Sequence, residues 1–426
     1  MSKALHFTAF QMLSPGDRGA WRDPDNVRDP TNLRYWQKQA QLLEAAGFDA
    51  IFFADILGVF ETRETGPELS VRDAHVFPLG DPFVLVSALA SVTEKLGFVV
   101  TASSTYEPAF LLARRFSTLD HFTGGRIGWN IVTSYLDSAA ANFGLNEQIS
   151  HGERYKRANE YIEVLEKLWL ESWEPGALVR DKDAGIYVDP AKVHPINHRG
   201  QYFNVRGPHL SEPSPQGKPV YFQATASEAG FDFAIRHSEA LYTNAGNLEG
   251  LAANIKKLEL LAAAAGRSRP RIFTGVTIGV ARTREEAQRK IDRQAQFQTD
   301  ESVLAWNGID IRQYTRDTLL SELKTYGTTR PLRSVNGRYD VTIQDYIDHV
   351  RNQQSPFTVV GTPEEVVDRL VEISEQTGLD GFNISSSSSP GIYDDFLEFL
   401  TPLLRKRGLL PEADAAPVHL RDRLAL

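Results

Sequence analysis

The chain has 426 residues, of which 42% are hydrophobic and 24% charged, values that fit a globular protein and exclude disordered, collagen-like and coiled-coil chains. Its 46 basic and 55 acidic side chains give a net charge of −9, so most of the surface would repel nucleic acid. The absence of cysteine excludes disulfides, iron–sulfur clusters, thiolate haem and cysteine nucleophiles.

The first ten residues hold one lysine and no long apolar run, and no uncharged stretch approaches the ~18 residues of a membrane span. We therefore expect a cytoplasmic protein that contacts no membrane. The segment Gly124-Gly125-Arg126-Ile127-Gly128 lacks the GxGxxG spacing, and no GxxxxGK[ST] motif occurs. The sequence thus shows no dinucleotide-binding domain.

Short apolar runs recur along the chain, separated by amphipathic segments of helical length. The runs cover residues 5–12, 50–54, 98–102, 127–132, 220–224, 240–243, 272–280 and 381–384. Helix signals between them predict helices over residues 32–46, 82–95, 108–122 and 155–169, with capping boxes at Ser150, Thr283 and Thr362. This alternation predicts an α/β protein with a parallel sheet.

Two insertions interrupt the repeat, at about residues 174–216 and 298–358. The first is rich in Pro, Gly and His, and the second contains Trp306, Tyr314 and Tyr326. Long connections of this kind serve as lids or binding loops, so we expect the second to cover the active site. We expect residues 1–426 to form a single domain.

Polar residues follow the apolar runs and distinguish two candidate folds, a (β/α)8 barrel and a doubly wound sheet. In a barrel the carboxyl ends of all strands converge on one mouth, whereas in an open sheet they spread along an edge. The polar residues at these ends are Asp55, Thr101, Ser103, Asn130, Gln223, Thr243 and Asn383. We therefore predict a TIM barrel with insertions, carrying its ligands at that mouth.

The segment from Gln223 to Gly230 joins a strand end to a helix start, where free backbone N–H groups bind anions. We expect the Ser227 N–H to point at a phosphate group. The alternative is that Ser227 serves only as an N-cap. A nucleophilic role for Ser227 is disfavoured because the GxSxG motif is absent.

His151 and Tyr155 lie four residues apart at another helix start, so they share one face and are good donors to phosphate. Alternatively, Tyr155 begins an apolar stripe and His151 is merely exposed. Near Asn130, Gly128 would let a planar ligand approach the strand. Alternatively, this segment is structural and Trp129 simply fills the core. His194 and His198 flank Pro195, which argues against a helix, so we expect no metal site.

Taken together, these segments resemble the bacterial-luciferase-like flavin monooxygenases, in the branch of nitrilotriacetate, EDTA, dibenzothiophene-sulfone and long-chain-alkane monooxygenases. The resemblance runs from residue 6 to about residue 408. The matching pieces are Trp21-Arg22, residues 47–55, 114–121 and 125–134, His151-Gly-Glu-Arg-Tyr155, residues 205–208 and 214–219, Gln223-Ala-Thr-Ala-Ser227 and Asp380-Gly-Phe-Asn383.

The resemblance implies a barrel that binds reduced FMN (FMNH2), supplied by a separate NAD(P)H:flavin reductase, and uses O2 on a small organic substrate. The reactions that it implies include C–N or C–S bond cleavage. We also expect a homo-oligomer, either a dimer or a tetramer. Carried over by position, Asp55 and Ser103 lie near the isoalloxazine and ribityl groups, with Thr101 and Asn130 beside them. His151, Tyr155 and Ser227 would hold the phosphate end.

The sequence departs from the alkane enzyme, in which a Cys and a His stand where this chain has Ser14 and Tyr135. Phe10, Trp21, Phe60 and Tyr135 either line a substrate pocket or are ordinary packing. Three functions stay open: an FMNH2-dependent monooxygenase, which we favour, a deazaflavin-dependent dehydrogenase on the same barrel, and a non-catalytic flavin-binding protein.

Overall fold

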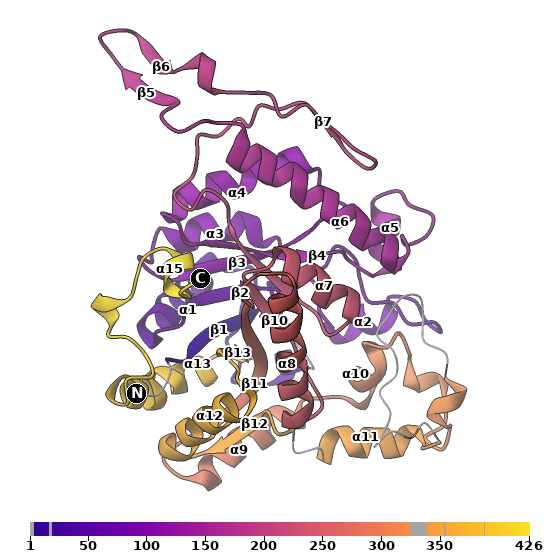
Figure 1. Cartoon of the computed structure of the whole chain (residues 1–426). Coiled ribbons are helices and arrows are strands. Elements are labelled where there is room, and N and C mark those ends of the chain that lie inside the picture. Colours follow the sequence, from indigo (N-terminus) through magenta and orange to yellow (C-terminus); the bar gives the residue numbers. More distant parts are fainter. Residues whose placement is uncertain (1–3, 17–18, 324–337, 339, 353–354, 387) are drawn as a thin grey trace.

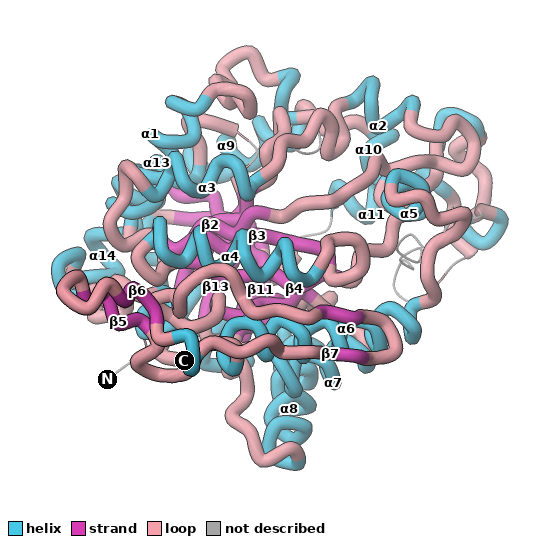
Figure 2. Tube along the Cα trace, turned by 90° about the horizontal axis from the view of Figure 1, so that it is seen from above, coloured by secondary structure: helices cyan, strands magenta, loops and turns pink. Residues whose placement is uncertain are grey.

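A computed structural model describes residues 4–16, 19–323, 338, 340–352, 355–386 and 388–426. At its centre is a closed barrel of parallel strands, drawn in magenta in Figure 2 with helices around it. The barrel strands are β1 (His6–Gln11), β2 (Ala50–Phe53), β3 (Gly97–Ser103), β4 (Ile127–Val132), β9 (Val220–Ala224), β10 (Ala240–Tyr242), β11 (Arg271–Val280) and β13 (Gly381–Ser385). Pairing of β10 with β11 closes the ring, which confirms the TIM barrel and excludes the doubly wound sheet.

Helices lie between consecutive strands and cover the outside of the barrel (Figure 1). The main ones are α1 (Leu33–Ala46), α3 (Pro82–Ala90), α4 (Ala109–Thr123), α6 (His151–Glu166), α7 (Glu228–His237), α8 (Leu248–Ala264) and α12 (Pro363–Thr377). A C-terminal run follows β13, comprising α13 (Ile392–Asp395), a π-helical turn (Phe396–Leu400) and α14 (Thr401–Lys406). All eight predicted apolar runs are barrel strands.

The predicted helix starts are mostly confirmed. The Asn32 side chain caps α1, and Thr362 and Glu365 form a complete capping box at α12. The helix expected to reach Lys95 ends at Ala90. The capping box at Ser150 is wrong, because its side chain makes no cap bond and Glu153 instead accepts a hydrogen bond from the Tyr202 hydroxyl.

Side chains on alternate strand positions form two apolar layers. One layer packs between strands and helices, and the other fills the barrel interior with Phe52, Phe222, Tyr242 and Phe273. Interior residues alternate along each strand, because successive side chains point to opposite faces. In this way residues two positions apart, such as Val99 and Thr101, share the interior.

The N-terminal end of the barrel is closed by α15 (Leu420–Arg423). Leu420 and Leu424 belong to the interior cluster. Gly97 makes room for this plug, because a Cβ there would lie 2.7 Å from Leu420 Cδ1. Arg423 fastens the helix by donating to the Phe48 carbonyl at 2.9 Å. The opposite end of the barrel is therefore the one left for ligands.

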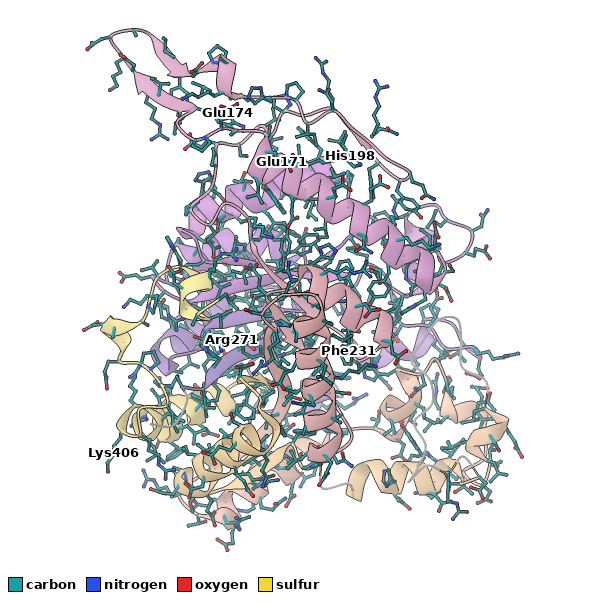
Figure 3. The ribbon with its side chains drawn as sticks, in the orientation of Figure 1. Glu171, Glu174, His198, Phe231, Arg271 and Lys406 are labelled. Atoms are coloured by element: carbon teal, nitrogen blue, oxygen red, sulfur yellow. The ribbon has the colours of Figure 1, made fainter. Side chains whose placement is uncertain are left out.

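The first insertion forms two small hairpins. One pairs β5 (Leu178–Asp181) with β6 (Ile186–Val188) and projects from the body at the top of Figure 1. The other pairs β7 (His198–Arg199) with β8 (Asn204–Val205) and lies along α6, with His198 labelled in Figure 3. Glu160 of α6 holds this second hairpin by accepting backbone N–H groups of Tyr202 and Phe203.

The second insertion contains α10 (Asp300–Ala305), α11 (Ile343–Asn352) and two 3-10 turns (Ile311–Gln313 and Leu320–Glu322). It has a small apolar core of its own, which includes Leu304, Ile309 and Ile343. Tyr326 lies outside the described residues. The insertion follows α9 (Arg284–Gln296) and leads into β12 (Thr358–Gly361), an additional strand that pairs with β11 beyond the barrel and was not predicted.

Candidate active site

Thr101 and Asn130 lie side by side near the carboxyl ends of β3 and β4. Both are about 3% exposed, and Asn130 Nδ2 donates to Thr101 Oγ1 at 2.8 Å. This bond fixes the orientation of the amide and leaves Asn130 Oδ1 buried without a hydrogen-bond partner among the described residues. A buried carbonyl oxygen without a donor is costly, so the position fits a ligand that carries an N–H or O–H group.

Ser103 ends β3 and is held from the neighbouring strand. The Ser134 hydroxyl donates to Ser103 Oγ at 2.9 Å, and the backbone N–H of Thr105 donates to the same oxygen at 3.2 Å. Ser134 has a φ of 53°, a left-handed conformation that a serine adopts only at a cost. The structure thus fixes Ser103 close to Thr101, as the sequence predicted for residues of one mouth.

Asp55 follows β2 and is half-buried. Burial, together with the nearby carboxylates of Asp81 and Glu107, raises the pKa of Asp55 to about 7. The backbone N–H of Ile56 donates to its Oδ1 at 2.9 Å. Near neutral pH the carboxyl is therefore partly protonated, so it can donate a proton as well as accept a hydrogen bond.

A second group of predicted residues lies where α6 and α7 pack together. His151 is exposed in the first turn of α6, and its ring lies 5.1 Å from that of Tyr155. The Tyr155 ring lies 5.6 Å from that of Phe233, in the second turn of α7. The Ser227 side chain caps α7 by accepting the backbone N–H of Gly230 at 3.1 Å.

The start of α7 offers backbone N–H groups, but not the one predicted. The Ser227 N–H donates to Thr225 Oγ1 at 3.2 Å, which corrects the expectation that it is free for a phosphate. The N–H groups of Glu228 and Ala229, in the first turn of α7, have no acceptor among the described residues. These two amides are the ones that an anion would meet.

Arg154 is a functional candidate that the sequence analysis missed. It is buried on α6 between His151 and Tyr155 in the sequence, and its Nε has no partner among the described residues. Burial lowers the pKa of this guanidinium, and one of its terminal nitrogens donates to the Ile149 carbonyl. Its position three residues after His151, on the same helix face, was the available signal.

Apolar side chains from the loops after β1, β2, β3 and β4 meet in a separate cluster, which we call the mouth cluster. Its members are the buried Phe60, Val76, Leu136 and Ala139 and the partly buried Met12, Ile56, Leu57, Leu79, Tyr106, Tyr135 and Trp306. The ring of Trp306, from the second insertion, lies 4.5 Å from that of Phe60. Two members directly follow candidate site residues in the sequence: Ile56 follows Asp55, and Tyr135 follows Ser134.

The structure places the predicted pocket residues in three different surroundings. Phe60 and Tyr135 lie together in the mouth cluster, with ring centroids 6.5 Å apart. Phe10 instead stacks on Phe52 at 5.9 Å in the barrel interior. Trp21 is 45% exposed and its indole N–H donates to the Asp73 carbonyl, which places it outside both groups.

His75 was also missed, and it joins the mouth cluster. It is 3% exposed, and its ring lies 5.4 Å from Phe60 and 4.7 Å from Trp306. The residues on either side, Ala74 and Val76, both have a φ of 54°. Two strained positions that flank one buried imidazole are typical of a functional site. No motif surrounds this residue in the sequence.

Polar contacts attach the second insertion to the loop after β2. Thr65 Oγ1 donates to Asp310 Oδ2 at 2.8 Å, and the Asp310 N–H donates to Glu64 Oε2 at 2.9 Å. The Tyr314 hydroxyl donates to the other Glu64 oxygen at 2.6 Å. Asp310 is fully buried and pairs with Arg312.

The other predicted polar residues lie outside the groups described above. Gln223 Oε1 and Thr243 Oγ1 are buried at neighbouring strand ends without partners among the described residues. His194 pairs with Glu174 at 2.7 Å and His198 with Glu160 at 3.3 Å. Across the described ranges, no three His, Asp or Glu side chains are grouped to hold a metal ion. No helix of those ranges is both long and apolar enough to cross a membrane.

Comparison with protein families gives a match over residues 8–381 to the luciferase-like monooxygenases. The chain belongs to this family. Because its curated relatives are named monooxygenases, the chain is a monooxygenase of the luciferase-like family, as the motifs predicted.

Two relatives are each 40% identical. The long-chain alkane monooxygenase of Geobacillus thermodenitrificans (strain NG80-2) matches over 96% of this chain and 91% of its own length. The dimethyl-sulfide monooxygenase of Hyphomicrobium sulfonivorans matches over 100% of this chain and 91% of its own length. Nitrilotriacetate monooxygenase component A of Aminobacter aminovorans is 34% identical over 100% of this chain and 97% of its own length.

Solved structures agree with the family fold. A crystal structure of a long-chain alkane monooxygenase superposes with a TM-score of 0.90 at 39% identity, covering 100% of this chain and 96% of that one. A riboflavin lyase, solved with modified FMN and riboflavin, superposes with a TM-score of 0.89 at 36% identity, again covering 100% and 96%. These proteins therefore share the fold of this chain over its whole length.

Proposed function

We propose that this luciferase-like monooxygenase is the oxygenase of a two-component system. It would take FMNH2 from a separate NAD(P)H:flavin reductase and use O2 to oxygenate a small organic substrate. The observation that carries this proposal is the unpaired, buried Asn130 Oδ1 beside Thr101 and near Ser103 at the barrel mouth. An isoalloxazine ring carries N–H groups that would satisfy such an acceptor.

The residues present fit FMN at both of its ends. Asn130, Ser103 and Asp55 would contact the ring and ribityl chain. Tyr155 and His151, with the free amides at the start of α7, would hold the phosphate. Ser227 would contribute its hydroxyl, since its own N–H is already bound to Thr225.

Two observations support a separate reductase: the sequence has no dinucleotide-binding motif, and one relative is named as a component. The described chain is one barrel without a dinucleotide-binding motif, so hydride from a nicotinamide would have to be delivered by another protein. The nitrilotriacetate relative is called component A, a name that implies a second component.

Bound reduced flavin would supply the electrons that activate O2 for transfer of one oxygen atom to the substrate. The chain's own residues position the reactants and exclude water. The mouth cluster adds apolar side chains at the mouth and includes Trp306 of the second insertion. Asp310 attaches that insertion to the loop after β2, an arrangement expected of a cover. Asp55, with a pKa of about 7, can hold or release a proton at the ring side of the mouth.

The test is isotope incorporation under defined supply of reduced flavin. The purified chain is mixed with FMN, NADH, a generic flavin reductase, 18O2 and, in turn, the substrates after which its relatives are named. We expect 18O in a product only when chain, FMN and reductase are all present. Product formation from NADH without the reductase would contradict the two-component arrangement, and the absence of 18O from every product would contradict the monooxygenase proposal.

A further inference from the structure

Helix α3 is apolar on its outer side as well as on its inner one. Its nine residues, Pro82–Ala90, include no charged side chain. Leu85, Val86 and Leu89 are buried, yet Val84 on the opposite side is 78% exposed. A surface helix normally carries polar and charged residues outward, and a helix that is hydrophobic all round is normally buried. The outer side of α3 therefore has the composition of a covered surface.

The apolar surface continues onto α4, which packs beside α3. The Phe83 ring of α3 lies 5.2 Å from the Phe116 ring of α4. On the outer side of α4, Leu111 is 37% exposed and Phe122 is 68% exposed. We call the outward residues of this helix pair the α3/α4 face, and they are Val84, Ser87, Ala88, Ser91, Leu111, Arg114, Thr118 and Phe122. Exposed large apolar residues on two neighbouring helices mark an interaction surface.

The α3/α4 face is complementary to itself in charge. Its one charged member, Arg114, is exposed, and its guanidinium makes no hydrogen bond or ion pair within the described residues. Exposed acids stand at the two ends of α3, Asp81 before it and Glu94 after it. In a two-fold pair of chains, an axis along the helices would bring Arg114 to Asp81 of the second copy, and an axis across them would bring it to Glu94. Either arrangement pairs unlike charges.

The other charged groups beside the face leave this balance unchanged. Arg115 pairs with Glu107 at 3.0 Å, and Lys95 donates to two backbone carbonyls near the C-terminus. Arg34 and Lys38 are exposed on α1, which packs on the other side of α3. These groups form a polar border around an apolar centre, as is usual for a protein interface.

A second copy of this chain is the occupant that fits such a face. A transient partner would leave the apolar residues in water whenever it departed, whereas a copy of the same chain is always present. Permanent homodimer interfaces are more apolar than transient ones, and a two-fold interface uses the same surface on both partners.

The available area is adequate for a dimer. Helices α1, α3 and α4 follow one another around the barrel (Figure 2). With axes ~10 Å apart and lengths of ~20 Å, three such helices cover roughly 600 Å², before the relief of their side chains is counted. Each partner in a stable complex buries about 800 Å². The helices and the loops at their ends can supply this area.

We propose that the α3/α4 face is the two-fold interface of a dimer of this chain, with Val84 and Leu111 in its apolar part and Arg114 opposite an acid of the other copy. The inner sides of both helices stay in the core of each chain, so assembly needs no refolding. The proposal does not depend on flavin chemistry and can fail or succeed separately from the proposed function.

Sedimentation velocity of the full chain tests the interface. We expect the wild type to sediment at twice its 47.6 kDa mass or at a higher even multiple. Val84→Glu would bury an unpaired carboxylate at the interface and should weaken dimerisation at least about 100-fold. Leu260→Glu, at a 61% exposed position of α8, should change nothing. A monomeric wild type, or an assembly that Val84→Glu leaves equally tight, would overturn the proposal.

Cross-linking locates the two-fold axis, because the chain has no cysteine. Ser87→Cys then carries the only thiol, and two copies of it approach each other across an isologous interface. A flexible bismaleimide should join Ser87→Cys chains into covalent dimers and leave Ser268→Cys, exposed beyond α8, as single chains. Equal cross-linking of both variants, or none of Ser87→Cys, would contradict the assignment.

Charge exchange tests the role of Arg114. Arg114→Glu should weaken the dimer about fivefold, as expected for an ion pair at the border of an interface. A change of sign at the acid opposite should restore the affinity, so either Asp81→Lys or Glu94→Lys should rescue Arg114→Glu, and the one that does gives the direction of the axis. Rescue by neither would show that the two faces do not meet as proposed.

Discussion

Asn130 Nδ2 donates to Thr101 Oγ1 at 2.8 Å, and the other end of the amide, Oδ1, is buried without a hydrogen-bond partner in the part of the chain that the structure describes. The two residues lie on neighbouring strands in direct register. An acceptor that is buried and unpaired in the free protein becomes paired only when a ligand supplies a donor. The relationship therefore links the strand register to cofactor binding.

Asn130→Leu is expected to weaken FMN binding about 5- to 30-fold, which corresponds to the ~1–2 kcal/mol of a buried hydrogen bond. The free protein should lose little stability, because the substitution also removes an unsatisfied oxygen. Flavin fluorescence titration and thermal unfolding measure the two effects. Asn204→Leu, on the exposed β8, is the control, and an unchanged FMN affinity in Asn130→Leu would contradict the assignment.

The phosphate assignment separates FMN from riboflavin. Tyr155→Phe should weaken FMN about 5- to 30-fold, as expected for loss of a ~1–2 kcal/mol hydrogen bond to a charged group, and leave riboflavin affinity unchanged. Tyr187→Phe should change neither. Equal losses for both flavins would show that Tyr155 acts on the ring or the fold and does not bind the phosphate.

Asp55 should make stability fall as pH rises. Its folded pKa of about 7 lies above the usual value of 3.8, so the native state holds more protons than the unfolded state between these two values. The free energy of unfolding therefore decreases from about pH 4 to pH 7, and the loss is complete above pH 7. Asp55→Asn removes this dependence.

Urea unfolding of wild type and Asp55→Asn at several pH values measures the difference directly. The stability of the variant relative to wild type should increase across that window and then level off. The exposed Asp183→Asn serves as the control. A difference that is independent of pH would mean that Asp55 is not protonated in the folded protein at neutral pH.

The attachment of the second insertion depends on Asp310. Asp310→Asn keeps the shape of the side chain but weakens its contacts with Thr65 and Arg312, so the insertion should open locally more often. Limited proteolysis within residues 298–358 should accelerate about tenfold for a ~1.4 kcal/mol loss, with the melting of the barrel nearly unchanged. Loss of global stability with no faster cleavage would argue that the insertion is not a separately opening unit.

The plug at the barrel floor predicts a purely structural effect. Leu420→Ala leaves a cavity beneath Gly97 and Gly128 and should cost about 2–5 kcal/mol of unfolding free energy. FMN affinity should stay unchanged, because the proposed FMN site lies at the opposite end of the barrel. Leu426→Ala, which is 40% exposed, should have little effect. A loss of FMN affinity in Leu420→Ala would contradict this separation of the two ends.

Much of the fold could be read from the sequence, because strands buried on both faces appear as continuous apolar runs. The strand β12 could not, since its four residues lie at the end of an insertion and pair only with an extension of β11. The plug was missed for another reason. Leu420 and Leu424 form a short apolar pair, and nothing local indicates that they enter the barrel.

The site was predictable where strand topology alone determines position, as for Thr101 and Asn130. It was not predictable where loops fold back on one another. His75 lies in a long loop and meets Trp306 more than two hundred positions later in the chain, and no local pattern encodes such an encounter. Ser227 shows a third case, because the sequence did not reveal that its N–H donates to Thr225 while its hydroxyl caps α7.

The most direct test of the central claim is an anaerobic titration of the chain with FMNH2, reduced riboflavin and a reduced deazaflavin, followed by fluorescence. We expect FMNH2 to bind most tightly, and we expect Asn130→Leu and Tyr155→Phe each to weaken it. Tighter binding of the deazaflavin, or FMNH2 binding that neither substitution changes, would contradict a reduced-FMN site at the barrel mouth.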